Sequence, residues 1–169
     1  MKAWKMEPIT ELPFGLAGKI YRSPMPDSLM SDPDHRVLPA YRQAGVRVVV
    51  MLTSAEEALA IRGSDLLATY NDGGFEVIYA PTRDFSVPEK GIFEPALRET
   101  LAAARAGKTI AIHCHAGVGR TGTFAACLAR MVFGFTGEEA IAWVRQSIPT
   151  AVENALQAQF VSEFTPDPD

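Results

Sequence analysis

The fold of this chain is decided by the stretch His113-Cys114-His115-Ala116-Gly117-Val118-Gly119-Arg120-Thr121-Gly122. The apolar run over residues 109–112 predicts a short buried strand before it, and residues 123–133 predict a helix after it. A strand, a glycine-containing loop and a helix N-terminus make an anion site, because backbone N–H groups point inward and the helix dipole favours negative charge. The stretch therefore predicts a cradle for a tetrahedral anion.

Two side chains of this stretch predict chemistry as well as binding. Five residues separate Cys114 from Arg120. The field that attracts an anion also favours a thiolate, which is the nucleophilic form of cysteine. The planar fork of Arg120 can hold two phosphate oxygens. The loop therefore supplies a nucleophile and a phosphate cradle together; the alternative is a buried structural cysteine beside a glycine turn.

The stretch resembles the signature of the cysteine-dependent protein phosphatases, in which His-Cys is followed after five residues by Arg and then Thr or Ser. The resemblance is sharp over residues 112–122 and extends loosely over residues 19–164, and the short length is similar to the small dual-specificity branch. It implies hydrolysis of phosphomonoesters through a phosphocysteine, with no cofactor and no metal. The anion contacts fall on the residues of the loop: His115, Ala116, Gly117, Val118, Gly119 and Arg120.

The reaction also needs an acid that protonates the leaving oxygen, and Asp84 is the best candidate. It lies 30 residues before Cys114, just after an apolar strand, in a segment with proline at both ends that predicts a loop. The family carries its general acid in a comparable loop, with a proline four residues on. The alternative is that Asp84 only caps a turn or pairs with Arg83. The rival acids are Asp65, Asp72 and Glu89.

Four further side chains receive supporting roles. Thr121 is placed to donate a hydrogen bond to the departing Cys114 sulfur, or is an ordinary residue of the first helical turn. The resemblance implies that His113 orients the loop through its backbone and that Gln157 contacts the active-site water. Gln157 is otherwise a solvated helix residue. His115 either lines the pocket rim, where it adds a titratable charge, or faces solvent.

The chain departs from the family at several positions. Thr82-Arg83 stands where a tryptophan and a proline usually precede the acid, and Ile148 stands where an arginine is usual. The large tyrosine-specific members of the family carry a recognition loop with a tyrosine that stacks on the substrate ring, and no such loop is found in this sequence. Arg22 either approaches the phosphate site or forms a surface salt bridge.

Three functions stay open beside hydrolysis of phosphotyrosine or phosphoserine/threonine proteins. Inositol phosphates and phosphoinositides use the same loop chemistry, and Arg83 with His115 keeps that substrate class open. A pseudophosphatase would bind a phosphorylated partner without turnover. Sulfur transfer and arsenate reduction also use a cysteine in an anion loop; arsenate reduction would need further thiols, and Cys127 is the only one available. Cys127 is either a small buried residue or a resolving thiol for oxidised Cys114.

Composition limits the class of protein. The chain has 169 residues, 47% of them hydrophobic, which is typical of a folded domain and not of a disordered chain. The net charge of −4 offers no field for nucleic acid. No apolar run reaches the roughly 18 residues of a membrane span, and residues 1–10 lack the apolar core of a signal peptide. Two cysteines, one of them assigned to catalysis, favour a reducing cytoplasm over a disulfide-forming compartment.

The rest of the chain predicts an α/β fold, a central and mostly parallel sheet flanked by helices. One domain is expected over residues 1–164, followed by a disordered tail at 165–169. Strands are predicted over residues 19–23, 46–52, 75–79 and 109–112. Helices are predicted over residues 33–44, 63–70, 91–106, 123–133 and 137–145, from Ser54, where Ser54 and Glu57 suggest a capping box, and from Ala151. The active site is expected where the strands end at their carboxyl edge.

Overall fold

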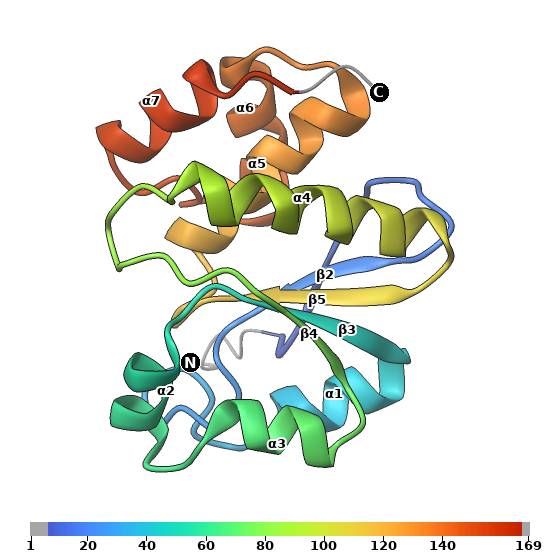
Figure 1. Ribbon diagram of the computed structural model, residues 1–169, viewed down its shortest axis with the longest axis vertical. Helices are drawn as coiled ribbons and strands as arrows, with labels where there is room; N and C mark the ends of the chain where they lie inside the picture. Colours follow the sequence, from blue (N-terminus) through green and yellow to red (C-terminus); the bar gives the residue numbers. More distant parts are fainter. Residues whose placement is uncertain (1–6, 167–169) are drawn as a thin grey trace, which may run out of the picture.

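A five-stranded sheet forms the centre of the computed structural model, which describes residues 7–166 (Figure 1). The strands are β1 (Thr10–Leu12), β2 (Ile20–Ser23), β3 (Val46–Met51), β4 (Glu76–Tyr79) and β5 (Thr109–His113), in the order β1-β2-β5-β3-β4. All neighbouring pairs are parallel except β1 and β2. The predicted mostly parallel sheet is confirmed, and β1 is an edge strand that the sequence did not indicate.

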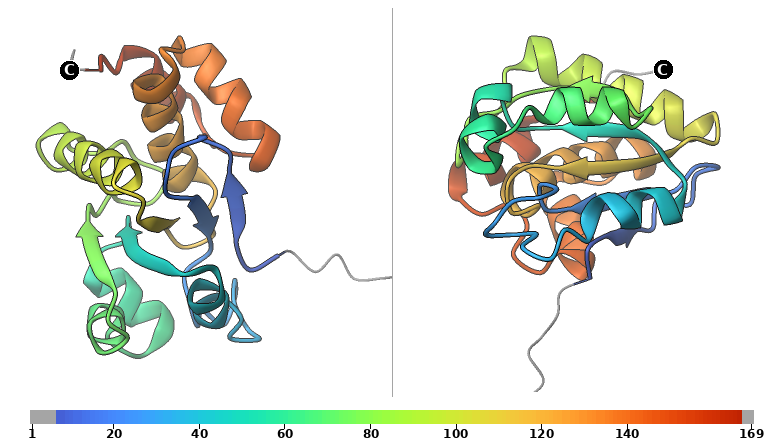
Figure 2. Two further views of the ribbon diagram at one scale, coloured as in Figure 1. Left: turned by 90° about the vertical axis from the view of Figure 1, so that its right-hand side faces the viewer. Right: turned by 90° about the horizontal axis from the view of Figure 1, so that it is seen from below.

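Seven helices of the described residues cover the two faces of the sheet. They are α1 (Val37–Ala44), α2 (Ala55–Arg62), α3 (Leu66–Asp72), α4 (Lys90–Arg105), α5 (Gly119–Phe133), α6 (Gly137–Ser147) and α7 (Ala155–Glu163). Figure 1 shows α1, α2 and α3 on one face, and α4 to α7 on the other; Figure 2 shows the same layers from two further sides.

Each face of the sheet has its own apolar core. The larger core joins β-strand residues such as Val50 and Ile112 to Leu97 of α4 and Phe124 of α5. The smaller core packs the other strand face against Tyr41 of α1 and Tyr70 of α3, with partners such as Val49 and Ala111. Burial on both faces explains why β3 and β5 read as continuous apolar runs.

Four helices begin three or four residues away from the predicted positions. Helix α3 begins at Leu66 instead of Gly63, because Asp65 is its N-cap and accepts from the backbone N–H of Ala68. Helix α1 begins at Val37 instead of Pro33, because the buried Asp32 carboxylate accepts hydrogen bonds from the backbone N–H groups of Arg36 and Val37. Helix α7 begins at Ala155 instead of Ala151. Helix α5 begins at Gly119, four residues earlier than predicted, so that Arg120 and Thr121 lie in its first turn.

The two ends of the predicted domain are only partly described. Residues 1–6 and 167–169 lie outside the described residues, so most of the predicted tail at 165–169 cannot be compared, and the single domain over 1–164 stays a prediction. Within residues 7–166, no helix has the length and hydropathy needed to cross a membrane.

Candidate active site

The loop between β5 and α5 stands at the carboxyl edge of the sheet, as the sequence predicts. Strand β5 ends at His113 and α5 begins at Gly119, so the loop itself runs from Cys114 to Val118. Gly117 has a φ of +73°, and a Cβ there would lie 2.2 Å from the carbonyl oxygen of Ser23. This position therefore requires glycine on both conformational and steric grounds.

Four successive carbonyl groups of the loop are bound on its outer side. The carbonyl oxygen of Cys114 contacts the His113 ring, and that of His115 accepts from the backbone N–H of Met25 at 2.8 Å and from Ser31 Oγ at 3.2 Å. The carbonyls of Ala116 and Gly117 accept from Arg22, as described next. Because these four oxygens already have partners within the protein, the loop N–H groups are the ones left for an anion.

Arg22 holds the loop from the neighbouring strand. Its Nε donates to the carbonyl of Gly117 at 3.0 Å and its Nη2 to the carbonyl of Ala116 at 2.9 Å. The residue is only 3% exposed, so a surface salt bridge is wrong. Burial lowers the pKa of Arg22, while the Cys114 sulfur acts in the opposite direction. The sequence signal was its place at the carboxyl end of a strand, directly beside the nucleophile strand in the sheet.

Both ring nitrogens of His113 have partners. Its Nδ1 lies 2.9 Å from the carbonyl oxygen of Cys114, and its Nε2 lies 2.7 Å from the hydroxyl of Tyr70. Burial lowers the pKa of His113 to about 4, with Arg120 adding to the effect and the backbone contact opposing it. The ring is therefore neutral near pH 7. A carbonyl can only accept, so Nδ1 carries the proton and Nε2 accepts from Tyr70.

Arg120 is held by a carboxylate that the sequence analysis assigned elsewhere. Its Nη1 and Nη2 donate to the two oxygens of Glu57 at 2.8 and 2.9 Å, and Nη1 also donates to the carbonyl of Thr82 at 3.0 Å. Burial alone would lower the pKa of Arg120, but the Glu57 hydrogen bonds and the nearby Cys114 raise it. The Nε of Arg120 has no hydrogen-bond partner among the described residues. One N–H of the buried fork is thus left for an incoming oxygen.

Glu57 lies three residues after Ser54, and this spacing suggested a capping box. Ser54 Oγ does accept from the backbone N–H of Glu57 at 3.0 Å, and Ser54 is the N-cap of α2. The Glu57 side chain, however, reaches Arg120 and does not return to the cap. The expected capping box is therefore only half formed, and its glutamate belongs to the site.

The nucleophile candidate and its hydroxyl partner are in direct contact. Thr121 Oγ1 donates to Cys114 Sγ at 3.2 Å. Both residues are buried, at 3% exposure for Cys114 and 0% for Thr121. The geometry fits the expectation that the hydroxyl stabilises a negatively charged sulfur.

Asp84 lies at the mouth of the same site. Its Oδ1 is 3.4 Å from Arg120 Nη2 and also accepts from the backbone N–H of Phe85 at 3.0 Å. The carbonyl of Phe85 in turn accepts from Asn154 Nδ2 at 2.9 Å, which ties the acid-bearing loop to the start of α7. The Asp84 side chain is about half exposed, so it can reach both substrate and water.

A cavity of about 280 Å³ opens between these groups. Its lining residues are Met30, Ser31, Asp84, Phe85, Cys114, His115, Ala116, Gly119, Arg120 and Glu153. His115 thus lines the cavity, with its Nε2 3.2 Å from Ser28 Oγ. Arg83 lines a neighbouring cavity with Glu57 and does not line this one.

Glu153 is a second carboxylate in this cavity that the sequence analysis missed. Its side chain lies against Gly119, where an added Cβ would come within 2.3 Å of Glu153 Oε2. Partial burial raises the pKa of Glu153, and the nearby Asp84 raises it further. Its place, in an irregular segment far along the chain from the loop, gave no local signal of this contact.

Gln157 is buried and close to the site, not solvated. Its Oε1 accepts from the backbone N–H of Glu153 at 2.8 Å, and its Nε2 has no hydrogen-bond partner among the described residues. The rival acids lie elsewhere: Asp65 caps α3, Asp72 ends α3, and Glu89 precedes α4, and none of them lines the cavity.

Cys127 occupies the larger apolar core on α5. Burial raises the pKa of its thiol, so it stays protonated and unreactive. Across residues 7–166, no three His, Cys, Asp or Glu side chains converge in a way that could hold a metal ion.

Fold and loop geometry together define a cysteine phosphatase domain of the dual-specificity type. The family model described as "Polymorphic toxin system, DSP-PTPase phosphatase" matches residues 24–132, and the chain belongs to this family. The match begins just after the end of β2 and covers the whole nucleophile loop.

Known proteins agree with this assignment. The protein tyrosine phosphatase domain-containing protein 1 of Bos taurus is 35% identical over 83 residues, which is 49% of this chain and 10% of that protein. A solved structure of kinase associated phosphatase, with its catalytic cysteine substituted by serine, superposes with a TM-score of 0.83 at 19% identity, covering 95% of this chain and 96% of that one. The active form of Tk-PTP gives a TM-score of 0.75 at 27% identity, covering 95% and 97%. The matched stretch is thus about a tenth of the length of the curated relative.

Proposed function

We propose that the protein hydrolyses phosphomonoesters through a phosphocysteine intermediate, and that its substrates are phosphotyrosine and, to a lesser degree, phosphoserine/threonine proteins. One observation carries the proposal: Asp84, from a loop 30 residues earlier in the chain, lines the same cavity as Cys114 and Arg120, and Thr121 contacts the Cys114 sulfur. A pseudophosphatase would lack at least one of these groups.

The first step transfers the phosphoryl group to sulfur. The Cys114 thiolate attacks phosphorus in line and forms the P–S bond while the P–O bond to the leaving group breaks. Asp84 in its acid form gives its proton to the departing oxygen. Arg120 and the loop N–H groups stabilise the charge on the three equatorial oxygens.

The second step releases phosphate. A water molecule attacks phosphorus and Asp84, now a carboxylate, takes its proton. The P–S bond breaks and its electron pair returns to Cys114 as thiolate, which the Thr121 hydroxyl stabilises. The unpartnered amide of Gln157 is available to orient this water. All the groups required come from the chain, so the reaction needs no metal or cofactor.

The charges of the cavity favour a substrate with a single phosphate. Arg120 is the one permanently charged cation among the described residues that line it, while Glu153 adds a second carboxyl group beside Asp84. A highly phosphorylated inositol would need several basic side chains to offset its charge. Because a thiolate nucleophile must stay reduced, we place the activity in the cytoplasm.

Hydrolysis of an aryl phosphate in the presence of a chelator tests the mechanism. Wild type should release phosphate, Cys114→Ser should release none, and Asp84→Asn should be slower by about 10²-fold or more. An unchanged rate in Asp84→Asn would move the acid to another residue, Glu153 first. Absence of turnover in wild type, with retained binding of a phosphopeptide, would leave a binding module.

The substrate class is tested separately. We expect kcat/KM for a phosphotyrosine peptide to exceed that for a polyphosphorylated inositol. Glu153→Gln should bring the kcat/KM values for these two substrates closer together, because it removes one negative charge beside the cradle. A wild-type preference for the inositol phosphate would overturn the protein-substrate assignment and leave the phosphocysteine mechanism intact.

A further inference from the structure

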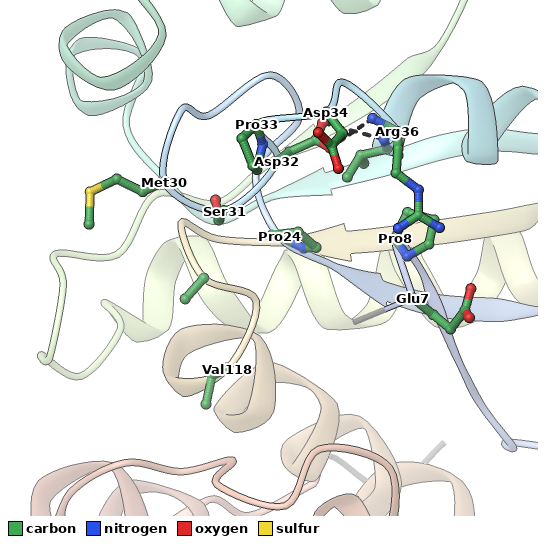
Figure 3. Close-up of a pocket in the computed structure, with 12 residues that line it drawn as sticks. Glu7, Pro8, Pro24, Met30, Ser31, Asp32, Pro33, Asp34, Arg36 and Val118 are labelled. Carbon is green, nitrogen blue, oxygen red and sulfur yellow. Dashed lines mark hydrogen bonds between the residues drawn. The ribbon is translucent and has the colours of Figure 1, made fainter. Parts of the chain in front are cut away.

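A second cavity, of about 390 Å³, lies beside the catalytic loop. Its lining comes from three segments, shown in Figure 3: Glu7 and Pro8 before β1, residues 24–37 between β2 and α1, and Val118 of the catalytic loop. The volume is within the roughly 300–1,000 Å³ typical of ligand sites. Apart from the loop residues Ala116 and Val118, no residue of the proposed mechanism lines this cavity.

The second cavity adjoins the catalytic one, because Met30, Ser31 and Ala116 line both. A phosphate in the catalytic loop and a neighbouring group in the second cavity would lie on either side of these three residues. The two adjoining cavities are together called the groove below.

The chemistry of the second cavity differs from that of the first. Apolar groups of Pro24, Pro33, Val37 and Val118 make up much of its wall, and the charged residues Glu7, Asp34 and Arg36 line it as well. Its buried carboxylate, Asp32, already accepts from three backbone N–H groups, of Asp27, Arg36 and Val37. The apolar part of the wall suits an apolar side chain.

Met30 stands between the two cavities with a largely unburied side chain. It is 83% exposed, although burial stabilises an apolar side chain of this size. Leu29, its neighbour on the same loop, is 76% exposed and lines neither cavity. An exposed apolar side chain at the junction of a groove is a candidate contact for a ligand, and its neighbour provides a matched control.

We propose that the second cavity receives an apolar side chain next to the phosphorylated residue of an extended polypeptide substrate, with Met30 covering it. The proposal rests on the proposed function and deepens it, since it identifies a sequence preference. A polypeptide carries both groups that the groove would bind, a phosphate and an apolar side chain one or more residues away. An inositol phosphate carries only the first.

The test uses phosphotyrosine peptides in which each flanking position in turn is leucine or serine. We expect one position at which leucine raises kcat/KM by about 10-fold over serine, as for one apolar side chain entering a pocket. Met30→Ser and Pro33→Asp should reduce that ratio to below about threefold. Leu29→Ser should leave the ratio unchanged. Thermal melting of each variant confirms that it is folded.

The outcomes separate this proposal from the proposed function. If wild type hydrolyses phenyl phosphate but no flanking position favours leucine, the second cavity is not a substrate subsite. A leucine preference that survives both Met30→Ser and Pro33→Asp would also overturn it. The same peptides are titrated into Cys114→Ser by calorimetry, so the preference is measured as a ratio of Kd values even if wild type has no turnover.

Discussion

Arg120 is in place before any phosphate binds, because Glu57 accepts from both of its terminal nitrogens. A bidentate pair of this kind fixes the plane of the guanidinium as well as its position. Because Nη1 and Nη2 already donate to Glu57, fewer N–H groups of the buried guanidinium are left for the substrate. The free Nε, and Nη2 shared with Asp84, are the groups that remain for substrate oxygens.

Replacing Glu57 should therefore damage catalysis through Arg120. In Glu57→Gln one of the two hydrogen bonds is lost and an amide N–H faces the guanidinium. We expect kcat/KM for an aryl phosphate to fall by about 10- to 100-fold, as for a small misplacement of a catalytic group. Glu56→Gln, an exposed neighbour in the same turn, is the control and should be within about twofold of wild type. Equal effects of the two would refute a positioning role for Glu57.

His113 should make the stability of the protein depend on pH. Its pKa is about 4 in the fold and about 6.5 when unfolded, so the unfolded chain binds more protons between these values. Its contribution is complete above pH 6.5 and is lost as pH falls toward 4, by about 3 kcal/mol in total. Urea unfolding of wild type and His113→Asn at pH 7.5, 5.5 and 4.5 measures this.

The test compares how steeply the free energy of unfolding changes with pH in the two proteins. Carboxylates titrate in both and cancel, so the free energy of unfolding should fall more steeply with decreasing pH in wild type than in His113→Asn. Parallel curves would mean that the ring is not buried in its neutral form.

At the scale of elements, the ends of helices are where sequence and structure differ most. Ser54 is the N-cap of α2, as its sequence context predicted. The same spacing suggested a capping role for Glu57, but Glu57 pairs with Arg120, 63 residues away. Glu153 was missed, and Arg22 was left between two alternatives, for the same reason: their contacts are tertiary. The helix around residues 137–147 had only its periodicity as a signal, yet there a complete capping box forms between Thr136 and Glu139.

Asn154 links the cap of α7 to the acid-bearing loop. Its Oδ1 accepts from the backbone N–H of Gln157 at 2.9 Å, and its Nδ2 donates to the carbonyl of Phe85. Asn154→Ser keeps a good N-cap but loses the reach to Phe85. We expect little change in Tm but a several-fold loss of activity, larger for phenyl phosphate than for p-nitrophenyl phosphate, because the poorer leaving group depends more on its proton from Asp84.

The reverse pattern is expected at the cap of α6. Thr136→Ala should lower stability by about 1 kcal/mol and leave both rates unchanged. If Asn154→Ser instead lowered Tm as Thr136→Ala does and slowed both substrates equally, the link to the acid loop would have no role in positioning Asp84.

For the whole molecule, the parts that are local in sequence could be predicted and the parts that depend on packing could not. The spacing of Cys114, Arg120 and Thr121 lies within one loop and one helical turn, so it follows from the sequence alone. The parallel sheet follows from strands that alternate with helices. The antiparallel β1 is three residues long and has no periodicity to detect.

A preformed cradle should stabilise the folded state when an oxyanion binds. Ligand that binds only the native state raises the free energy of unfolding by RT ln(1 + [L]/Kd), or about 2.7 kcal/mol at 100 times Kd. We expect tungstate to raise the Tm of Cys114→Ser by several degrees. The shift should be much smaller when Arg120→Lys is added, since lysine cannot form the planar fork. Equal shifts would place the anion outside the loop.

The two hydrogen bonds from Arg22 to the loop have a consequence for how the protein folds. Residues 22 and 117 are 95 positions apart, and the contact exists only when β2 lies beside β5. A partly folded chain that has built β5 and α5, but has not yet docked its first strands, holds the complete signature sequence without an ordered cradle. Affinity for phosphate then appears only late in folding, after the longest chain closures are made. Retention on an immobilised phosphate analogue would therefore report native topology, and would separate correctly folded molecules from misassembled ones of identical sequence.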